Sequence, residues 1–273
     1  MFVTEPLIYL QLQKTACTHI ARLLNTYLGG EQIGKHRRMP RHYLNSSQVI
    51  LGSVRNPWDW YVSLWAFGCS GQGDLRRRLG EREIWPHVKN LPRHPTGALK
   101  NLRGELTKPI QQWADLYSDA HDPQKFRQWL HLLFNPHRQY DLREGYAHSA
   151  IAPFAGLMTY RYLRLHCLDI TPLYQPHIQT WSHLYDFDQA QNMLTAVIRM
   201  EHLSEDFITI LAQVGYPLTP IQAAEVRSSH KSNPSNHRHF RDYYDEAAIA
   251  LVADREQLII EKYNYSFAPS SLM

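Results

Sequence analysis

Three times along the chain, a short apolar run leads directly into a polar turn and then into a segment with helical spacing. The apolar runs cover residues 7–12, 49–54 and 194–200, and the helical patterns that follow cover residues 18–28, 58–67 and 204–214. Short apolar runs bounded by turns are typical of buried strands, and apolar residues three and four positions apart are typical of helices. Strand–turn–helix units that repeat in this way favour an α/β fold, in which helices cover both faces of a mostly parallel central sheet.

Residues at the ends of these segments support the same assignment. Gly29 and Gly30 follow the first helical pattern, as glycines do at the ends of helices. Asn56 and Pro57 open the second pattern, where an N-cap residue and a proline in the first turn are expected. Further helices are predicted over residues 110–117, 123–134 and 245–263 from their apolar spacing.

Residues 68–109 differ from the rest in being rich in glycine, arginine and proline. This composition predicts a loop-rich insertion, or lid, at the rim of a single domain that spans residues 1–273. Arginines occur in two groups, at positions 37, 38 and 41 and at positions 76, 77, 78 and 82. Two interpretations of these groups stay open, since they either attract a polyanion or nucleotide or form solvated faces.

The composition predicts a globular protein that resides in the cytoplasm. The chain has 273 residues, of which 44% are hydrophobic, and no run approaches the roughly 18 apolar residues of a membrane span. A basic stretch followed by an apolar stretch is absent from the start of the sequence, so no signal peptide and no transmembrane segment are expected. Three widely spaced cysteines favour reduced thiols over disulfides. The formal net charge of +4 is compatible with an anionic ligand.

Two of the polar turns carry cations and hydroxyl groups. Lys14, Thr15 and Thr18 lie where the first strand gives way to a helix, and free backbone N–H groups at such a junction suit a phosphate or a sulfate. Arg55 ends the second strand, and Ser63 follows eight residues later. Because ligands of open α/β sheets bind at the carboxyl ends of the strands, both turns are predicted to contribute to one site.

The sequence Lys14-Thr15-Ala16-Cys17-Thr18, taken together with Arg55 and Ser63, resembles the two cofactor-binding motifs of sulfotransferases that use 3'-phosphoadenosine 5'-phosphosulfate (PAPS). Residues 199–207 resemble a segment of bacterial sulfotransferase-domain proteins, and Asn233-Pro234-Ser235 with residues 240–244 resembles their C-terminal region. The resemblance covers most of the chain outside residues 68–109. The first turn lacks the G-x-x-x-x-G-K-[ST] pattern of nucleotide triphosphatases, and Cys17 stands where the family usually has glycine.

This resemblance implies a P-loop-like three-layer α/β/α fold and transfer of a sulfuryl group from PAPS to a hydroxyl or amine by in-line displacement. It implies that no metal is required and that the products include 3'-phosphoadenosine 5'-phosphate (PAP). Lys14 would be catalytic, contacting the bridging oxygen where negative charge develops. The implied cofactor contacts are a 5'-phosphate site at Lys14, Thr15, Ala16, Cys17 and Thr18, adenine stacking at His19, and a 3'-phosphate site at Arg55 and Ser63.

A general base is needed to take the proton from the acceptor, and His36 is the first choice. The cations around it, in Lys35-His36-Arg37-Arg38, are expected to lower its pKa and so favour the neutral form. A purely structural role for His36 stays open. His42, His94 and Glu201 are the reserve choices.

Other functions are also open. An ATP-dependent phosphoryl-transfer enzyme would require magnesium, and a non-catalytic protein would bind nucleotides or polyanions through its arginines. A nucleophilic Cys17 with a lowered pKa is a further option, because the thiol lies at a helix start. The pair His237 and His239 has no partner motif for a metal site. We expect a small-molecule or carbohydrate acceptor and no specific nucleic-acid partner.

Overall fold

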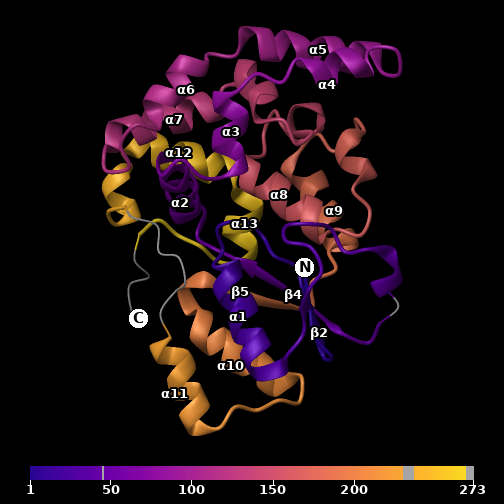
Figure 1. Cartoon of the computed structure of the whole chain (residues 1–273), viewed down its shortest axis with the longest axis vertical. Coiled ribbons are helices and arrows are strands. Elements are labelled where there is room, and N and C mark those ends of the chain that lie inside the picture. The colour runs from indigo at the N-terminus through magenta and orange to yellow at the C-terminus, as the bar shows by residue number, and fades with distance from the viewer. Residues whose placement is uncertain (45, 230–236, 269–273) are drawn as a thin grey trace. The chain divides into compact units, whose positions relative to one another are not determined.

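The computed structural model describes residues 1–44, 46–229 and 237–268, which form two compact units (Figure 1). Unit 1 is composed of Met1–Asn56, Arg161–Thr171 and Ser182–Pro234. Unit 2 is composed of Pro57–Tyr160, Pro172–Trp181 and Ser235–Met273. Each unit combines segments that are far apart in the sequence, and the prediction of one domain stays a prediction.

Unit 1 is an α/β structure built on a five-stranded sheet with the order β3-β1-β2-β4-β5. The strands are β1 (Phe2–Val3), β2 (Leu7–Tyr9), β3 (Glu31–Gln32), β4 (Val49–Val54) and β5 (Ala196–Arg199). β4 pairs in parallel with both β2 and β5, whereas β1 pairs antiparallel with β2 and β3. The sheet is therefore mixed, and the prediction of a mostly parallel sheet is not confirmed, because β1 and β3 add two antiparallel pairings.

One face of this sheet shares a hydrophobic core with helices α1 (Cys17–Leu28), α10 (Leu203–Gln213) and α11 (Pro220–Ser228). Side chains alternate along a strand, so Leu7 and Tyr9 point to the same face, and Tyr9 pairs with Leu51 of β4. These residues pack with Ile20 of α1 and Phe207 of α10. The three predicted apolar runs are confirmed as β2, β4 and β5, and each leads into a helix as expected.

Unit 2 is helical. Its helices are α2 (Pro57–Cys69), α3 (Asp74–Gly80), α4 (Trp85–Asn90), α5 (Pro95–Thr107), α6 (Ile110–Leu116), α7 (Pro123–Leu133), α12 (Glu246–Arg255) and α13 (Gln257–Lys262), while α8 (Leu157–His166) and α9 (Trp181–Gln191) contribute residues to both units. The predicted helix over residues 123–134 is present as α7, and the Asp122 carboxylate caps it by accepting hydrogen bonds from the N–H groups of Gln124 and Lys125. No helix in the described part of the chain is long and apolar enough to cross a membrane.

Residues 68–109 are not loop-rich, so this prediction is wrong. They contain the whole of three helices, α3, α4 and α5. A buried ion cluster holds the segment: the Glu105 carboxylate lies 2.7 Å from the Lys108 ammonium and 2.7 Å from the Arg143 guanidinium. The Lys108 ammonium also donates to the carbonyls of Arg78 and Glu81. Tertiary ion pairs of this kind leave no periodic apolar signal, which explains why composition alone suggests loops.

Candidate functional site

The turn between β2 and α1 has an unusual backbone. Lys14 and Ala16 both adopt left-handed conformations, with φ of 64° and 58°, and Cys17 is the first residue of α1. A left-handed residue other than glycine costs about 1–2 kcal/mol, and such residues in a turn aim backbone N–H groups at a shared anion site. The strained positions are therefore 14 and 16, so the structure does not require glycine at position 17.

A chain of buried hydroxyl groups supports this turn from the sheet. The Thr15 hydroxyl donates to the Leu12 carbonyl at 2.8 Å, so it must accept from the Ser53 hydroxyl, 2.6 Å away. Ser53 in turn accepts from the Tyr9 hydroxyl at 2.6 Å. Thr15 therefore positions the turn through its hydroxyl group, whereas the sequence predicts a phosphate contact there. Ser53 was missed, although a serine inside a buried strand is a signal that could have revealed it.

Three cations approach the turn. The Arg55 guanidinium donates to the Lys14 carbonyl at 3.2 Å, and the Lys35 ammonium donates to the Thr18 hydroxyl at 2.7 Å. Burial lowers the pKa of Lys14 to about 8, and the positive charges of Arg55 and Lys35 contribute to the same shift. The turn is thus a region of positive potential in which Lys14 keeps its proton at neutral pH. The contact of Lys35 with Thr18 was not predicted, since nothing in the local pattern of Lys35 distinguishes it from a surface lysine.

His36 lies beside the same turn. Its Nδ1 donates to the Gln11 carbonyl at 2.8 Å, because a carbonyl can only accept, so Nε2 carries the lone pair of the neutral ring. The pKa of His36 is lowered, as predicted, although burial is the largest cause. The charges of Lys35 and Arg161 lower it further, and the bond to Gln11 opposes the shift. Neutral His36 can accept a proton at Nε2.

His19 is an interior residue, with 3% of its surface exposed. The Arg22 guanidinium donates to its Nδ1 at 3.1 Å, and its Nε2 lies 3.2 Å from the Ser229 hydroxyl. A buried ring held at both nitrogens does not present the open face that stacking against an adenine requires. The predicted adenine contact at His19 is thus not supported by its placement.

The remaining predicted residues are distributed over both units. Ser63 lies in α2 of unit 2 and is 1% exposed, whereas Arg55 directly follows β4 in unit 1. Glu201, a reserve base, accepts a hydrogen bond from the Asn56 N–H at 2.7 Å. Two other reserve bases, His42 and His94, lie in unit 1 and unit 2, respectively. The segment Asn233-Pro234-Ser235 lies outside the described residues.

Cys17 is buried, and burial raises the pKa of its thiol. A helix start was expected to lower this pKa, but desolvation disfavours the charged thiolate by more than the nearby cations favour it. The burial and the raised pKa of the Cys17 thiol therefore do not support the option of a Cys17 nucleophile. In unit 1, Cys17 instead packs in the core that joins α1 to the sheet.

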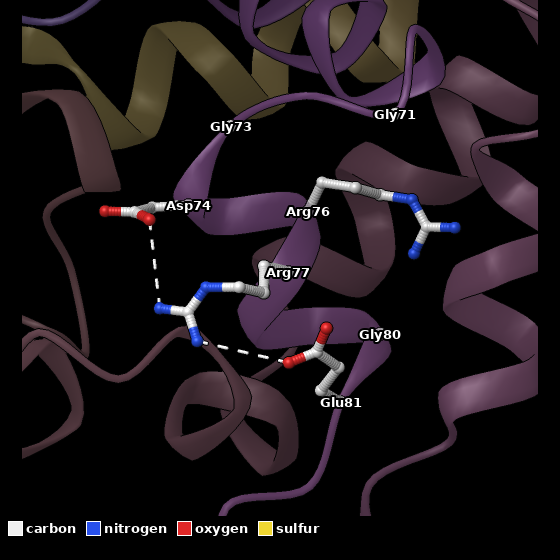
Figure 2. Close-up of a pocket in the computed structure, with 7 residues that line it drawn as sticks. All are labelled: Gly71, Gly73, Asp74, Arg76, Arg77, Gly80 and Glu81. Atoms are coloured by element: carbon white, nitrogen blue, oxygen red, sulfur yellow. Dashed lines mark ion pairs between the residues drawn. The ribbon is translucent and has the colours of Figure 1, made fainter.

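The second arginine group is largely engaged within unit 2. Arg77 pairs with Glu83 at 2.8 Å, Arg78 pairs with Glu144, and the Arg76 guanidinium lies over the Tyr117 ring. Residues between positions 71 and 81 line a pocket, and Figure 2 shows Arg77 reaching toward Asp74 and Glu81 there. The arginines of this group are thus engaged in contacts within unit 2, which favours a structural role over binding of a polyanion.

Within the described ranges, no group of three or more His, Cys, Asp or Glu side chains is arranged to share a metal ion. Unit 1 thus brings together the turn with Lys14, the predicted residues Arg55 and His36, and Lys35, which sequence reasoning did not place there. A scan against protein-family models, a search of curated proteins and a search of solved structures each give no match.

Proposed function

We propose that this chain is a PAPS-dependent sulfotransferase with a P-loop-like three-layer α/β/α fold. The observation that carries the proposal is the hydrogen bond from the Arg55 guanidinium to the Lys14 carbonyl. It joins the two motifs at the carboxyl ends of adjacent parallel strands, β2 and β4. Cations fixed at this edge of a sheet suit a nucleotide that carries anionic groups at more than one position.

The turn supplies the donors for the 5'-phosphosulfate. Backbone N–H groups at the start of α1 favour negative charge, and the left-handed Lys14 and Ala16 shape the turn around them. Thr15 keeps the turn in place through Ser53, while Thr18 and Lys35 lie at the exposed side of the first helical turn. Arg55 is assigned to the 3'-phosphate, for which a planar guanidinium offers two parallel hydrogen bonds.

PAPS supplies the sulfuryl group when it is bound. Lys14, protonated at neutral pH, stabilises the negative charge that grows on the departing phosphate oxygen as its bond to sulfur breaks. Neutral His36 accepts the acceptor's proton at Nε2 as the hydroxyl or amine forms its new bond to sulfur. The step balances, since the electron pair of the broken sulfur–oxygen bond leaves with PAP and the acceptor's proton remains on the His36 imidazole.

Incubation with sulfur-labelled PAPS and a panel of hydroxyl and amine acceptors tests this proposal. The unmodified protein should transfer label, and Lys14→Ala should lose transfer while keeping its circular dichroism spectrum. The control Lys262→Ala, which changes an exposed lysine of unit 2, should behave as the parent. Transfer from phosphate-labelled ATP with magnesium would instead support the phosphoryl-transfer alternative. Salt-sensitive heparin binding that survives Lys14→Ala, without any transfer, would support the non-catalytic alternative.

A further inference from the structure

Exposed apolar side chains are concentrated on α4 and α5 of unit 2. Among the residues that the structure describes, nine large hydrophobic side chains are exposed, and four of them lie between residues 84 and 106. They are Ile84 at 39%, Trp85 at 65%, and Leu99 and Leu106 at 56% each. The two helices lie side by side (Figure 1), so this segment forms a helical hairpin with an apolar exterior.

Helix α5 has two different faces. Ala98, Asn101 and Glu105, spaced three and four residues apart, face the rest of unit 2: Ala98 and Glu105 are buried, and Asn101 bonds to His148 at 2.8 Å. Gly104 approaches Tyr140 so closely that a Cβ atom would lie 2.6 Å from the tyrosine Cβ. These contacts and the ion pair of Glu105 with Lys108 fix the orientation of the helix.

The opposite face of α5 combines apolar and basic side chains. Leu99, Arg103 and Leu106 lie four and three residues apart, so they form one stripe along the helix, and all three are exposed. Lys100 is also exposed beside this stripe. On α4, the Lys89 ammonium lies 5.6 Å from the centre of the exposed Trp85 ring. Each helix of the hairpin therefore exposes cations beside apolar side chains.

The exposed charge of the hairpin is entirely positive. Lys89, Arg93, Lys100 and Arg103 are exposed, and none of them forms an ion pair with any residue in the described ranges. The one acidic residue between positions 84 and 107, Glu105, is 2% exposed and is used in the buried ion cluster. A partner for this face must therefore accept apolar side chains and carry negative charge.

We propose that the outer face of the α4–α5 hairpin, defined by Trp85, Lys89, Leu99, Lys100, Arg103 and Leu106, binds the surface of an anionic lipid bilayer. Amphipathic helices with Trp and Leu among Lys and Arg insert their apolar side chains at the boundary of headgroups and acyl chains. Anionic headgroups attract the adjacent cations. A nucleic-acid backbone would satisfy the cations but would leave Leu99 and Leu106 without an apolar environment. The bilayer offers both an apolar environment and negative charge.

Co-sedimentation with vesicles tests this inference on the full chain. Vesicles of phosphatidylcholine with about 30% phosphatidylserine should bind the protein, and phosphatidylcholine alone should bind it much less. Removing two cations in Lys100→Gln/Arg103→Gln should weaken binding to the anionic vesicles about 30-fold. Leu99→Ser/Leu106→Ser should also weaken it, whereas the control Ile221→Ser/Lys262→Gln, which removes an apolar and a charged side chain elsewhere, should not.

Fluorescence gives a second readout. Brominated lipids should quench the emission of the exposed Trp85, and Trp85→Phe should abolish this quenching. No binding to anionic vesicles, or equal binding by all the variants, would overturn the inference. Binding to polyglutamate that matches vesicle binding and is unaffected by Leu99→Ser/Leu106→Ser would also overturn it, in favour of an acidic protein partner.

Discussion

The Thr15 hydroxyl lies 2.6 Å from the Ser53 hydroxyl, and both side chains are fully buried. This contact links the turn after β2 to the neighbouring strand β4. Through it, the strained backbone at Lys14 and Ala16 is supported by the sheet rather than by a glycine-rich loop. The anion site that we propose thus depends on a polar network in the interior of unit 1.

Replacing Ser53 with alanine tests this dependence. Ser53→Ala leaves the buried Tyr9 hydroxyl without its acceptor and should lower the free energy of unfolding by about 1–3 kcal/mol. Because the turn loses its support, PAP affinity should fall as well. Denaturant unfolding and calorimetry measure the two effects. Ser46→Ala removes an exposed hydroxyl in unit 1 and should change stability by less than about 0.5 kcal/mol; equal effects of the two variants would contradict the role of Ser53.

The pKa of Lys14 predicts how anion binding changes with pH. Its pKa of about 8 lies below the ordinary value of 10.5, so the unliganded site loses its proton as the pH rises through 8. PAP affinity should then decline above pH 8, and calorimetry between pH 7 and 10 measures the decline. Folding stability of the unliganded protein should change in the opposite direction to PAP affinity. The unfolded chain holds the Lys14 proton more tightly than the folded protein does, so the contribution of Lys14 to stability increases as the pH rises from about 8 to 10.

Lys14→Arg is the control for this pH dependence. An arginine keeps its charge throughout the range, so the decline above pH 8 should disappear. A decline that is unchanged in Lys14→Arg would assign it to another group. The comparison remains informative even if the arginine binds PAP more weakly, because only the shape of the profile is compared.

His36 should act on the rate rather than on cofactor binding. It has a left-handed backbone with φ of 59°, which asparagine tolerates, so His36→Asn removes the base with little strain. Transfer should slow by about 10²–10⁴-fold, while PAP affinity changes little. The acidic limb of the pH–rate profile should disappear in the variant. Unchanged kcat would return His36 to a structural role.

The raised pKa of Glu256 predicts that the stability of unit 2 depends on pH. Burial raises the pKa of this carboxyl to about 7, although it accepts hydrogen bonds from Tyr61, Met158 and Thr159. The folded state therefore holds the proton of Glu256 more tightly than the unfolded chain does. The stability that this proton contributes is fully present below about pH 4.5 and is lost as the pH rises through 7. The loss should reach about 3 kcal/mol at most.

Unfolding in denaturant at pH 5 and pH 8 measures the effect of Glu256. Glu256→Gln should remove the loss of stability that Glu256 causes between these two pH values, whatever its effect on absolute stability, while the opposite effect of the lowered pKa of His36 remains. Glu246→Gln, which changes an exposed glutamate of α12, should keep the difference. A loss of stability from pH 5 to pH 8 that is unchanged in size in Glu256→Gln would show that another group causes it.

The sequence predicts the parts of the fold that have strong local patterns. β2, β4 and β5 and the helices after them follow from apolar runs, glycines and the Asn56-Pro57 pair, and their ends agree within a few residues. β1 and β3 have two residues each, which is too short for a periodic pattern, so the antiparallel pairings were missed. Helices α3 to α5 were missed because the ion cluster around Glu105 stabilises them from a distance in sequence.

The candidate site likewise contains residues that local sequence patterns reveal and residues whose roles they do not. Lys14, Arg55 and His36 lie close in sequence to recognisable turns, and unit 1 brings all three to the region of one turn. The roles of Thr15, His19 and Cys17 depend on burial, which only the folded structure reveals. Lys35 contacts Thr18 across 17 positions, and no local signal indicates that contact.

Selectivity for the 3'-phosphate is the property that most directly tests the proposed function. Calorimetric titration should show that PAP binds more tightly than ADP and AMP, by about 10–100-fold, since charge-assisted hydrogen bonds contribute about 1.5–3 kcal/mol. Arg55→Ala should reduce PAP affinity to that of ADP without weakening ADP binding, and Arg55→Lys should fall between the two. Equal affinity of the unmodified protein for PAP, ADP and AMP, or full PAP affinity in Arg55→Ala, would contradict the assignment.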